Sequence, residues 1–252
     1  MKKYVVALLL SMTAQAASAT ALDQFRDGHF AEAAAAGRSE ATAASLILAG
    51  RSTLTIAGFE TSDKAKAAAL IDAAARDFDA ALAKAPTNNE ALLQKAMAIG
   101  YRAKLSKSPG LARETRQLME AAVTREPNNG LAWASVAGWH AGAISTLGKF
   151  VAGTVLGANL GTAIKDFDTA LTKDPRNPVH RVFYALTLLD LDSDNAPRAA
   201  ALLREADKLP ARDGYEAILK RGSAQVLPLL ERGDVKAARL AARRLLPFGT
   251  LA

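Results

Sequence analysis

The sequence predicts an all-α protein built from stacked antiparallel helix pairs. Three segments share one template, in which a large apolar residue is followed by an alanine three positions later and a proline five positions after that. The copies are Phe78/Ala81/Pro86, Met119/Ala122/Pro127 and Phe167/Ala170/Pro175. Hydrophobic residues make up 50% of the chain and aromatic residues only 6%, so we expect a core rich in alanine, the best helix former. Alternating runs of β-branched and aromatic residues, which would predict strands, are absent from the sequence. Repeated helix pairs of this kind predict a solenoid.

The first 19 residues have the pattern of a secretory signal peptide. Lys2 and Lys3 precede an apolar run over residues 4–12, and Ala17-Ser18-Ala19 offers a cleavage site, with Ala14-Gln15-Ala16 as the competing site. We expect cleavage near Ala19, which leaves residues 20–252 as the helical domain. The sequence contains no cysteine that could carry a lipid anchor. We therefore expect an exported, soluble protein of a bacterial periplasm.

The helices are expected to begin at capping residues and to end at proline or glycine. The expected helical ranges are 28–38, 42–57, 63–84, 89–104, 111–125, 161–173, 215–230 and 234–246, with further helices beginning after capping residues. The expected caps are Ser62 or Asp63, Asn88 or Asn89, Asn129, Asn177 (followed by Pro178 at the first helical position), and Asp194 or Asn195.

The repeated template resembles the second helix of the tetratricopeptide repeat, whose series is small, aromatic, alanine, proline. Two copies match this series at every position: Ala74, Phe78, Ala81 and Pro86, and Ala163, Phe167, Ala170 and Pro175. The best-matching repeats span residues 62–209, and they are spaced more widely than the regular period of about 34 residues. The resemblance implies a right-handed superhelical solenoid that serves as a scaffold or adaptor for protein partners.

The stretch from Trp139 to Phe167 also resembles, more weakly, the T component of TRAP solute transporters, a tetratricopeptide-like periplasmic family. This resemblance implies an alternative function, that of an accessory subunit that handles hydrophobic small ligands. Members of that family are commonly lipid-anchored, whereas this sequence has no cysteine.

The concave groove of such a solenoid is lined by one face of the first helix of each pair. Aligning the copies predicts a mostly apolar lining, which suits a protein partner, an apolar peptide or a lipid-like ligand. The predicted lining residues are Leu93, Met97, Tyr101, Leu131, Ala134, Gly138, Ala141, Val179, Val182 and Leu186. The alternative is that these residues form core because an insertion in the second copy closes the groove.

This insertion, residues 146–160, is apolar and rich in glycine. Because an exposed loop is normally polar, we expect the insertion to pack over or beside the groove as a mobile flap. Phe150, Val151, Val155 and Leu156 would supply its apolar contacts. The alternative is a short packed helix that fills a gap between repeats.

The formal net charge of +7 is uneven along the chain, with an excess of basic residues near the C-terminus. Arg232, Lys236, Arg239 and Arg243 recur at helical spacing and form a basic stripe. We expect the stripe either to face solvent or to contact an acidic partner or anionic lipid headgroups. Nucleic acid is not expected as a partner, because the chain carries an export signal and aromatic residues do not interleave with the basic ones.

The sequence offers no recognisable catalytic, cofactor or metal-binding constellation. His29, His140 and His180 are far apart, and cysteine is absent. His140 falls where the repeat packs an aromatic residue, so we expect it in the core. No phosphate loop and no nucleophile elbow follows a predicted strand. We therefore expect a non-enzymatic protein without cofactor or metal.

Overall fold

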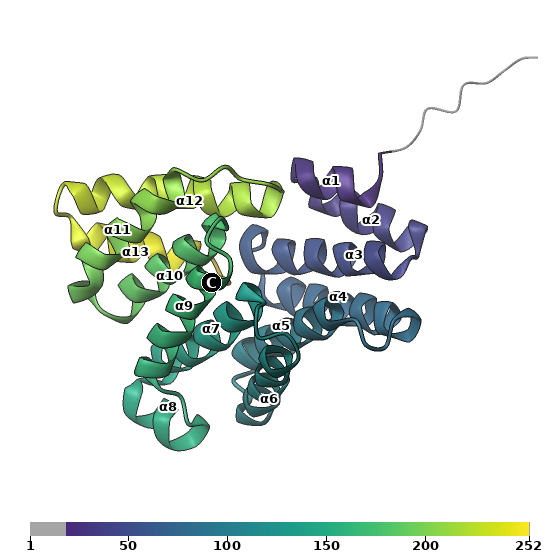
Figure 1. The fold of residues 1–252 in the computed structure, drawn as a ribbon, viewed down its shortest axis with the longest axis horizontal. Coiled ribbons are helices and arrows are strands. Elements are labelled where there is room, and N and C mark those ends of the chain that lie inside the picture. Colours follow the sequence, from purple (N-terminus) through teal and green to yellow (C-terminus); the bar gives the residue numbers. More distant parts are fainter. Residues whose placement is uncertain (1–18, 252) are drawn as a thin grey trace, which may run out of the picture.

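The computed structural model describes residues 19–251, and the all-α prediction is confirmed for this part of the chain (Figure 1). The predicted signal peptide falls on residues that lie, apart from Ala19, outside the described ones. No strand occurs between residues 19 and 251. The helices are α1 (Ala21–Asp27), α2 (Phe30–Glu40), α3 (Ala43–Thr55), α4 (Lys64–Lys84), α5 (Asn89–Ser106), α6 (Pro109–Arg125), α7 (Gly130–Leu147), α8 (Lys149–Leu156), α9 (Leu160–Lys173), α10 (Pro178–Leu191), α11 (Ala196–Asp207), α12 (Gly214–Glu231) and α13 (Val235–Leu245), with a π-helical turn η1 (Ile56–Glu60) and a 3-10 turn η2 (Ser193–Asn195).

Each helix packs mainly against its neighbours in the chain. The helices from α1 to α6 pack in sequence order, and α10 packs against α11 and α12 against α13 (Figure 1). The exception is α7, whose main partner is α9, so that α8 lies outside the series of paired helices. Local pairing of this kind is what the repeated template predicts.

Three hairpin turns, residues 85–88, 126–129 and 174–177, have the same backbone geometry. Their first residues have φ between −141° and −131° and ψ between 73° and 78°. In each turn the last residue is an asparagine whose main-chain N–H donates to the carbonyl oxygen of the first residue, at 2.9 to 3.3 Å. Its side chain then accepts from main-chain N–H groups in the first turn of the next helix. The repeat in the sequence is therefore a repeat of backbone geometry.

Most predicted boundaries agree with the structure, and the capping residues are Asp63, Asn88, Asn129 and Asn177. The N-terminal segment differs, because α1 was not predicted. Thr20 caps α1, and Gly28 ends it in the left-handed conformation. The predicted break near Gly58 comes later, at Thr61, because η1 continues α3 by one wide turn.

Small residues allow the helices to pack closely. The template residues Phe78, Ala81, Phe167 and Ala170 are fully buried. A β-carbon on Gly50 of α3 would lie 2.4 Å from the ring of Phe78 on α4. The alanine-rich and glycine-containing composition thus sets the distance between neighbouring helices.

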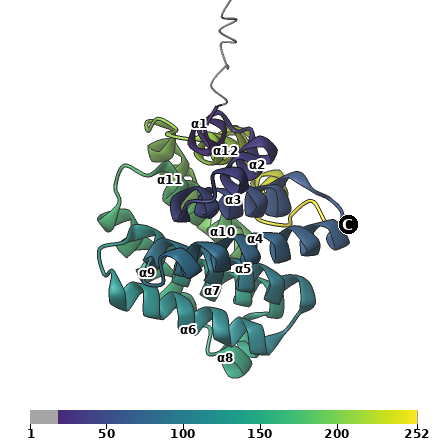
Figure 2. The ribbon, with the colours of Figure 1, turned by 90° about the vertical axis from the view of Figure 1, so that its right-hand side faces the viewer.

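The series of helices closes on itself, because α12 returns to α1 (Figures 1 and 2). At this contact a β-carbon on Gly214 would lie 2.3 Å from the Cα atom of Gly28. Beside it the rings of Phe59 and Tyr215 meet edge to face at 5.9 Å between centroids. The C-terminal part of the chain can therefore cover surfaces that an open solenoid would expose.

Candidate binding surfaces

The predicted groove residues of α10 are covered by the C-terminal helices. Val179, Val182 and Leu186 are buried. They belong to a core cluster formed with residues of α11, α12 and α13: Ala199, Leu203, Ala206, Leu219, Val226, Ala238 and Ala242. These positions of α10 are core, because three later helices lie against them.

The predicted groove residues of α7 are also largely enclosed. Ala134 and Ala141 are buried, whereas Leu131 and Gly138 are half-buried. The ring of Phe183 on α10 lies over Gly138, where a β-carbon would come within 2.9 Å of it. Little of this part of the predicted lining reaches the surface.

Two of the three predicted groove residues of α5 pack against the segment that follows α13. Leu93 is buried in the cluster between α5, α6 and α7. Met97 and Tyr101 are half-buried and pack in a cluster that contains Phe248 and Leu251. These last two residues belong to the segment 247–251, which follows α13 and which we call the C-terminal tail. On α5, then, the groove position is occupied by the chain's own tail.

The tail makes both main-chain and side-chain contacts. The main-chain N–H of Phe248 donates to the carbonyl oxygen of Gly58 at 2.8 Å, and the Lys104 ammonium donates to the carbonyl oxygen of Pro247 at 3.0 Å. The ring of Phe248, only 8% exposed, meets the Tyr101 ring edge to face at 4.8 Å between centroids. Lys104 lies 5.7 Å from the centre of the same ring.

The two side chains that contact the tail, Tyr101 and Lys104, have shifted pKa values. Burial raises the pKa of the Tyr101 phenol well above its usual range, and the nearby Tyr215 adds to the effect. Burial also lowers the pKa of the Lys104 ammonium, against the attraction of Asp190. The Tyr101 ring is half-buried at this contact, whereas the Lys104 side chain remains exposed to solvent at its edge.

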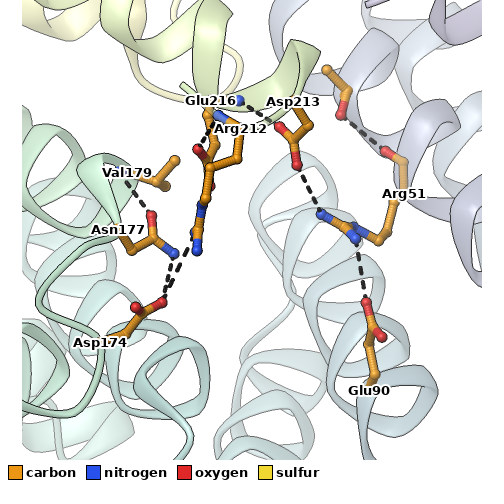
Figure 3. Close-up of polar contacts among 9 residues, drawn as sticks. Arg51, Glu90, Asp174, Asn177, Val179, Arg212, Asp213 and Glu216 are labelled. Atoms are coloured by element: carbon orange, nitrogen blue, oxygen red, sulfur yellow. Dashed lines mark hydrogen bonds and ion pairs between the residues drawn. The ribbon is translucent and has the colours of Figure 1, made fainter. Parts of the chain in front are cut away.

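A seam of polar contacts borders the return of α12 to the N-terminal helices (Figure 3). Arg51 on α3 lies 3.3 Å from Glu90 on α5 and 4.0 Å from Asp213, the capping residue of α12. The guanidinium of Arg51 also stacks over the ring of Phe25 at 4.7 Å. One arginine thus connects α1, α3, α5 and α12, and we call these contacts the closure seam.

A second group of polar contacts, also drawn in Figure 3, links the connection between α11 and α12 to the turn before α10. Arg212 pairs with the buried carboxylate of Glu216 at 2.6 Å and lies 4.0 Å from Asp174. The hydrogen bond to Glu216 is the main reason that the pKa of Arg212 is raised. Asp174 also accepts from the side chain of Asn177 at 3.0 Å, so the repeated turn takes part in this contact.

The insertion forms the short helix α8, which packs against α6 and α7 rather than over the predicted groove. Of the four expected apolar contacts, only Leu156 is buried, at 8% exposure. Phe150, Val151 and Val155 are 84%, 43% and 40% exposed. The expectation that all four pack over or beside the groove is thus corrected, because the groove position of α5 is covered by the tail and α8 lies against other helices. A short packed helix, the alternative, is what forms.

His140 lies in the core beneath the connection between α8 and α9, as expected. Its side chain is 1% exposed, and its Nδ1 atom accepts from the main-chain N–H of Asn159 at 3.2 Å. Burial lowers the pKa of His140 to about 4, and the charge of Arg116 acts in the same direction. The imidazole is therefore neutral at physiological pH and serves as an acceptor.

Half of the predicted basic stripe is used to dock α13 onto α10. Arg239 donates to the carbonyl oxygens of Asp190 and Leu191 at 2.9 and 3.3 Å, and Arg243 pairs with the Asp190 carboxylate at 2.5 Å. Arg232 and Lys236 are exposed. Only part of the stripe is thus available to a partner.

Between residues 19 and 251 the protein holds no group of three or more histidine, aspartate or glutamate side chains that could bind a metal ion. Two hollows on its surface are open to solvent. One lies on α9 beside Lys165 and Asp168, and the other is at the turn 126–129.

The C-terminal tail is the feature that the sequence interpretation missed. An apolar Leu-Leu-Pro-Phe run directly after the last basic helix was the available signal, since such a run must be covered by something. Local patterns do not reveal that the cover lies on α5, more than a hundred residues earlier in the chain. Comparison with known proteins gives no assignment: no family model matches this chain, and no curated sequence matches it either.

Proposed function

We propose that this protein is an exported, non-enzymatic helical-repeat protein that binds an extended segment of a partner protein at the position where its own C-terminal tail lies. The observation that carries the proposal is the tail itself. Residues 247–251 lie against α5 and η1 as a bound peptide would. A scaffold or adaptor role follows from such binding.

The contacts of the tail are ones that a segment of another chain could also make. Two of them involve the tail's main chain, which every peptide has: the N–H of Phe248 and the carbonyl oxygen of Pro247. A third is the aromatic side chain of Phe248, which contacts Tyr101 and Lys104. Main-chain hydrogen bonds with one anchoring side chain are a common mode of peptide recognition. We therefore expect the partner segment to carry an aromatic residue after a proline or another extended residue.

The tail is suited to release. It is a short segment outside the helices, and few main-chain hydrogen bonds join it to the rest of the protein. Phe248 has φ of 66°, a left-handed conformation that is strained for a residue other than glycine. Release of the tail relieves this strain, which favours exchange with a partner segment.

The alternative function, handling of a hydrophobic small ligand, has no such support. Two hollows on the described surface, on α9 and at the turn 126–129, are open to solvent and have charged or amide side chains in their lining. We therefore propose a protein segment, rather than a hydrophobic small molecule, as the ligand.

The test uses a fluorescent synthetic peptide of residues 245–252 and the full-length protein. Phe248→Ala weakens the protein's own tail, so the labelled peptide should bind this variant at least about tenfold more tightly than the wild type, in which the tail competes. Adding Lys104→Met, which removes the ammonium but keeps the apolar stem, should reverse the gain. A peptide in which alanine replaces the phenylalanine is the matched control and should not bind.

Equal affinity for the Phe248→Ala protein and for the double variant would contradict the proposal, provided that circular dichroism shows all proteins folded. Binding that is unchanged by loss of the phenylalanine from the peptide would contradict it as well. In either case the tail would be a fixed part of the fold rather than a ligand held in its own site.

A further inference from the structure

We propose that α8 docks this protein onto an anionic lipid surface, with Phe150, Val151 and Val155 entering the headgroup region. The proposal does not depend on the function proposed above, because α8 and the C-terminal tail lie against different helices.

The first observation is a concentration of exposed apolar side chains on one short helix. Phe150 is 84% exposed, and Leu147, Val151 and Val155 are each about two-fifths exposed. Only seven large hydrophobic residues are this exposed between residues 19 and 251, and four of them fall within nine positions of one another here. Apolar groups gathered in this way face a partner or a membrane more often than bulk water.

The second observation is charge. From Pro127 to Lys165 the sequence contains no aspartate or glutamate. Lys149 begins α8 and is exposed, and Arg113 of α6 reaches the carbonyl oxygen of Val155 at 3.4 Å. Apolar side chains flanked by cations and free of nearby carboxylates on their own segment complement a membrane with anionic headgroups.

The third observation is that α8 is held in place. Ala152 and Leu156 are buried beneath it, and Arg116 donates to the carbonyl oxygens of Leu156 and Gly157 at 3.3 and 3.2 Å. These bonds satisfy the C-terminal carbonyl groups of the helix. The apolar face is therefore presented by a fixed helix, so little ordering is needed when it binds.

The position of α8 suits contact with a flat surface. It lies at the lower extreme of the molecule in both perpendicular views (Figures 1 and 2). Within the described residues no helix has the length and hydropathy needed to cross a bilayer. The eight residues of α8 are also few beside the roughly 20–30 residues that each partner contributes to a stable protein interface. A lipid surface is therefore the occupant we favour over a protein.

The test measures sedimentation of the full-length protein with vesicles. Binding is expected to phosphatidylglycerol mixed with phosphatidylcholine, and at least about tenfold less to phosphatidylcholine alone or in high salt. The variant with Phe150→Ser and Val155→Ser should lose at least about tenfold in binding to the anionic vesicles. The matched control is Leu240→Ser, an exposed leucine on α13 beside the basic stripe, which should bind as the wild type does.

Three results would overturn the proposal. One is no binding of the wild type to anionic vesicles. Another is an equal loss in the Leu240→Ser control or in a variant with Arg232→Ala and Lys236→Ala, which would assign binding to α13. The third is light scattering that shows self-association through α8 without vesicle binding. The tail-peptide titration in the Phe150→Ser and Val155→Ser protein keeps the two proposals separate, because it should be unchanged.

Discussion

Two regions of the protein are apolar: the predicted groove on α5 and α10, and the outer face of α8. Other parts of the chain cover the groove, whereas the outer face of α8 is exposed to solvent. On α5 and α10, later parts of the same chain lie against the apolar residues: the tail on Tyr101, and α11 to α13 on Val182 and Leu186. On α8 only the inner residues are covered, and Phe150 extends into solvent. Hydrophobic pattern alone therefore does not identify a binding surface. What decides is whether another part of the chain reaches it.

The largest expected effect on stability comes from replacing the buried Phe248, and the exposed Phe150 serves as the comparison. Phe248→Ala should lower the free energy of unfolding by about 3 kcal/mol, because a buried aromatic side chain is lost. Phe150→Ala should change it by less than about 0.5 kcal/mol, because that ring is exposed. Urea unfolding followed by circular dichroism measures both. Similar losses in the two variants would break the comparison between the covered and the open surface.

A second prediction concerns the contact that lets the C-terminal helices cover the groove. Gly214→Ala should cost about 2 kcal/mol, because its β-carbon would collide with main-chain atoms of Gly28 that cannot move aside. The matched control is Gly142→Ala in α7, where no atom lies within 4 Å of the added carbon. That change should be neutral or stabilising by up to about 1 kcal/mol. The melting temperature should fall in Gly214→Ala and should stay unchanged or rise in Gly142→Ala. Equal shifts would show that α12 does not meet α1 closely.

A third prediction concerns the pH dependence of stability, to which the two buried histidines His140 and His180 contribute. His140 lies under α8 and His180 beside Asp174 near the closure seam, and burial lowers the pKa of each to about 4. Between about pH 6.5 and pH 4 the unfolded chain binds protons that the folded protein does not, so stability should fall as the pH falls through this window. We expect a loss of about 1 kcal/mol from each histidine.

Urea unfolding at pH 7 and pH 4.5 tests this expectation in His140→Asn and His180→Asn. Each variant should show a smaller loss of stability on acidification than the wild type. A pH dependence that is unchanged in both variants would mean that neither imidazole is held neutral by the fold.

The smallest expected effect is in the closure seam. Arg51→Gln removes the charge that faces Glu90 and Asp213, and these contacts are long and partly exposed. We expect a loss of less than about 1 kcal/mol that becomes smaller in high salt. A loss of several kcal/mol would mean that the seam, rather than the packing of glycine and tail, holds the helical series closed.

The hairpins were predictable from the sequence because their signals are local. Asn129, Asn177 and Pro178 act within a few residues of their own position, and the structure uses each as expected. The cover of the groove was not predictable, because it depends on contacts such as that between Lys104 and Pro247 across most of the chain. The composition of the insertion predicted that Phe150 packs over or beside the groove, whereas the residue is exposed on α8.

Amide hydrogen exchange at Phe248 tests the central claim most directly, because its N–H donates to Gly58 only while the tail is seated. We predict slow exchange at Phe248 in the free protein and at least about tenfold faster exchange when excess synthetic tail peptide is added, since the peptide takes the place of the tail. The exchange of Asn177, in a hairpin turn, should not change. Fast exchange at Phe248 in the free protein, or protection that persists with the peptide bound, would contradict the account.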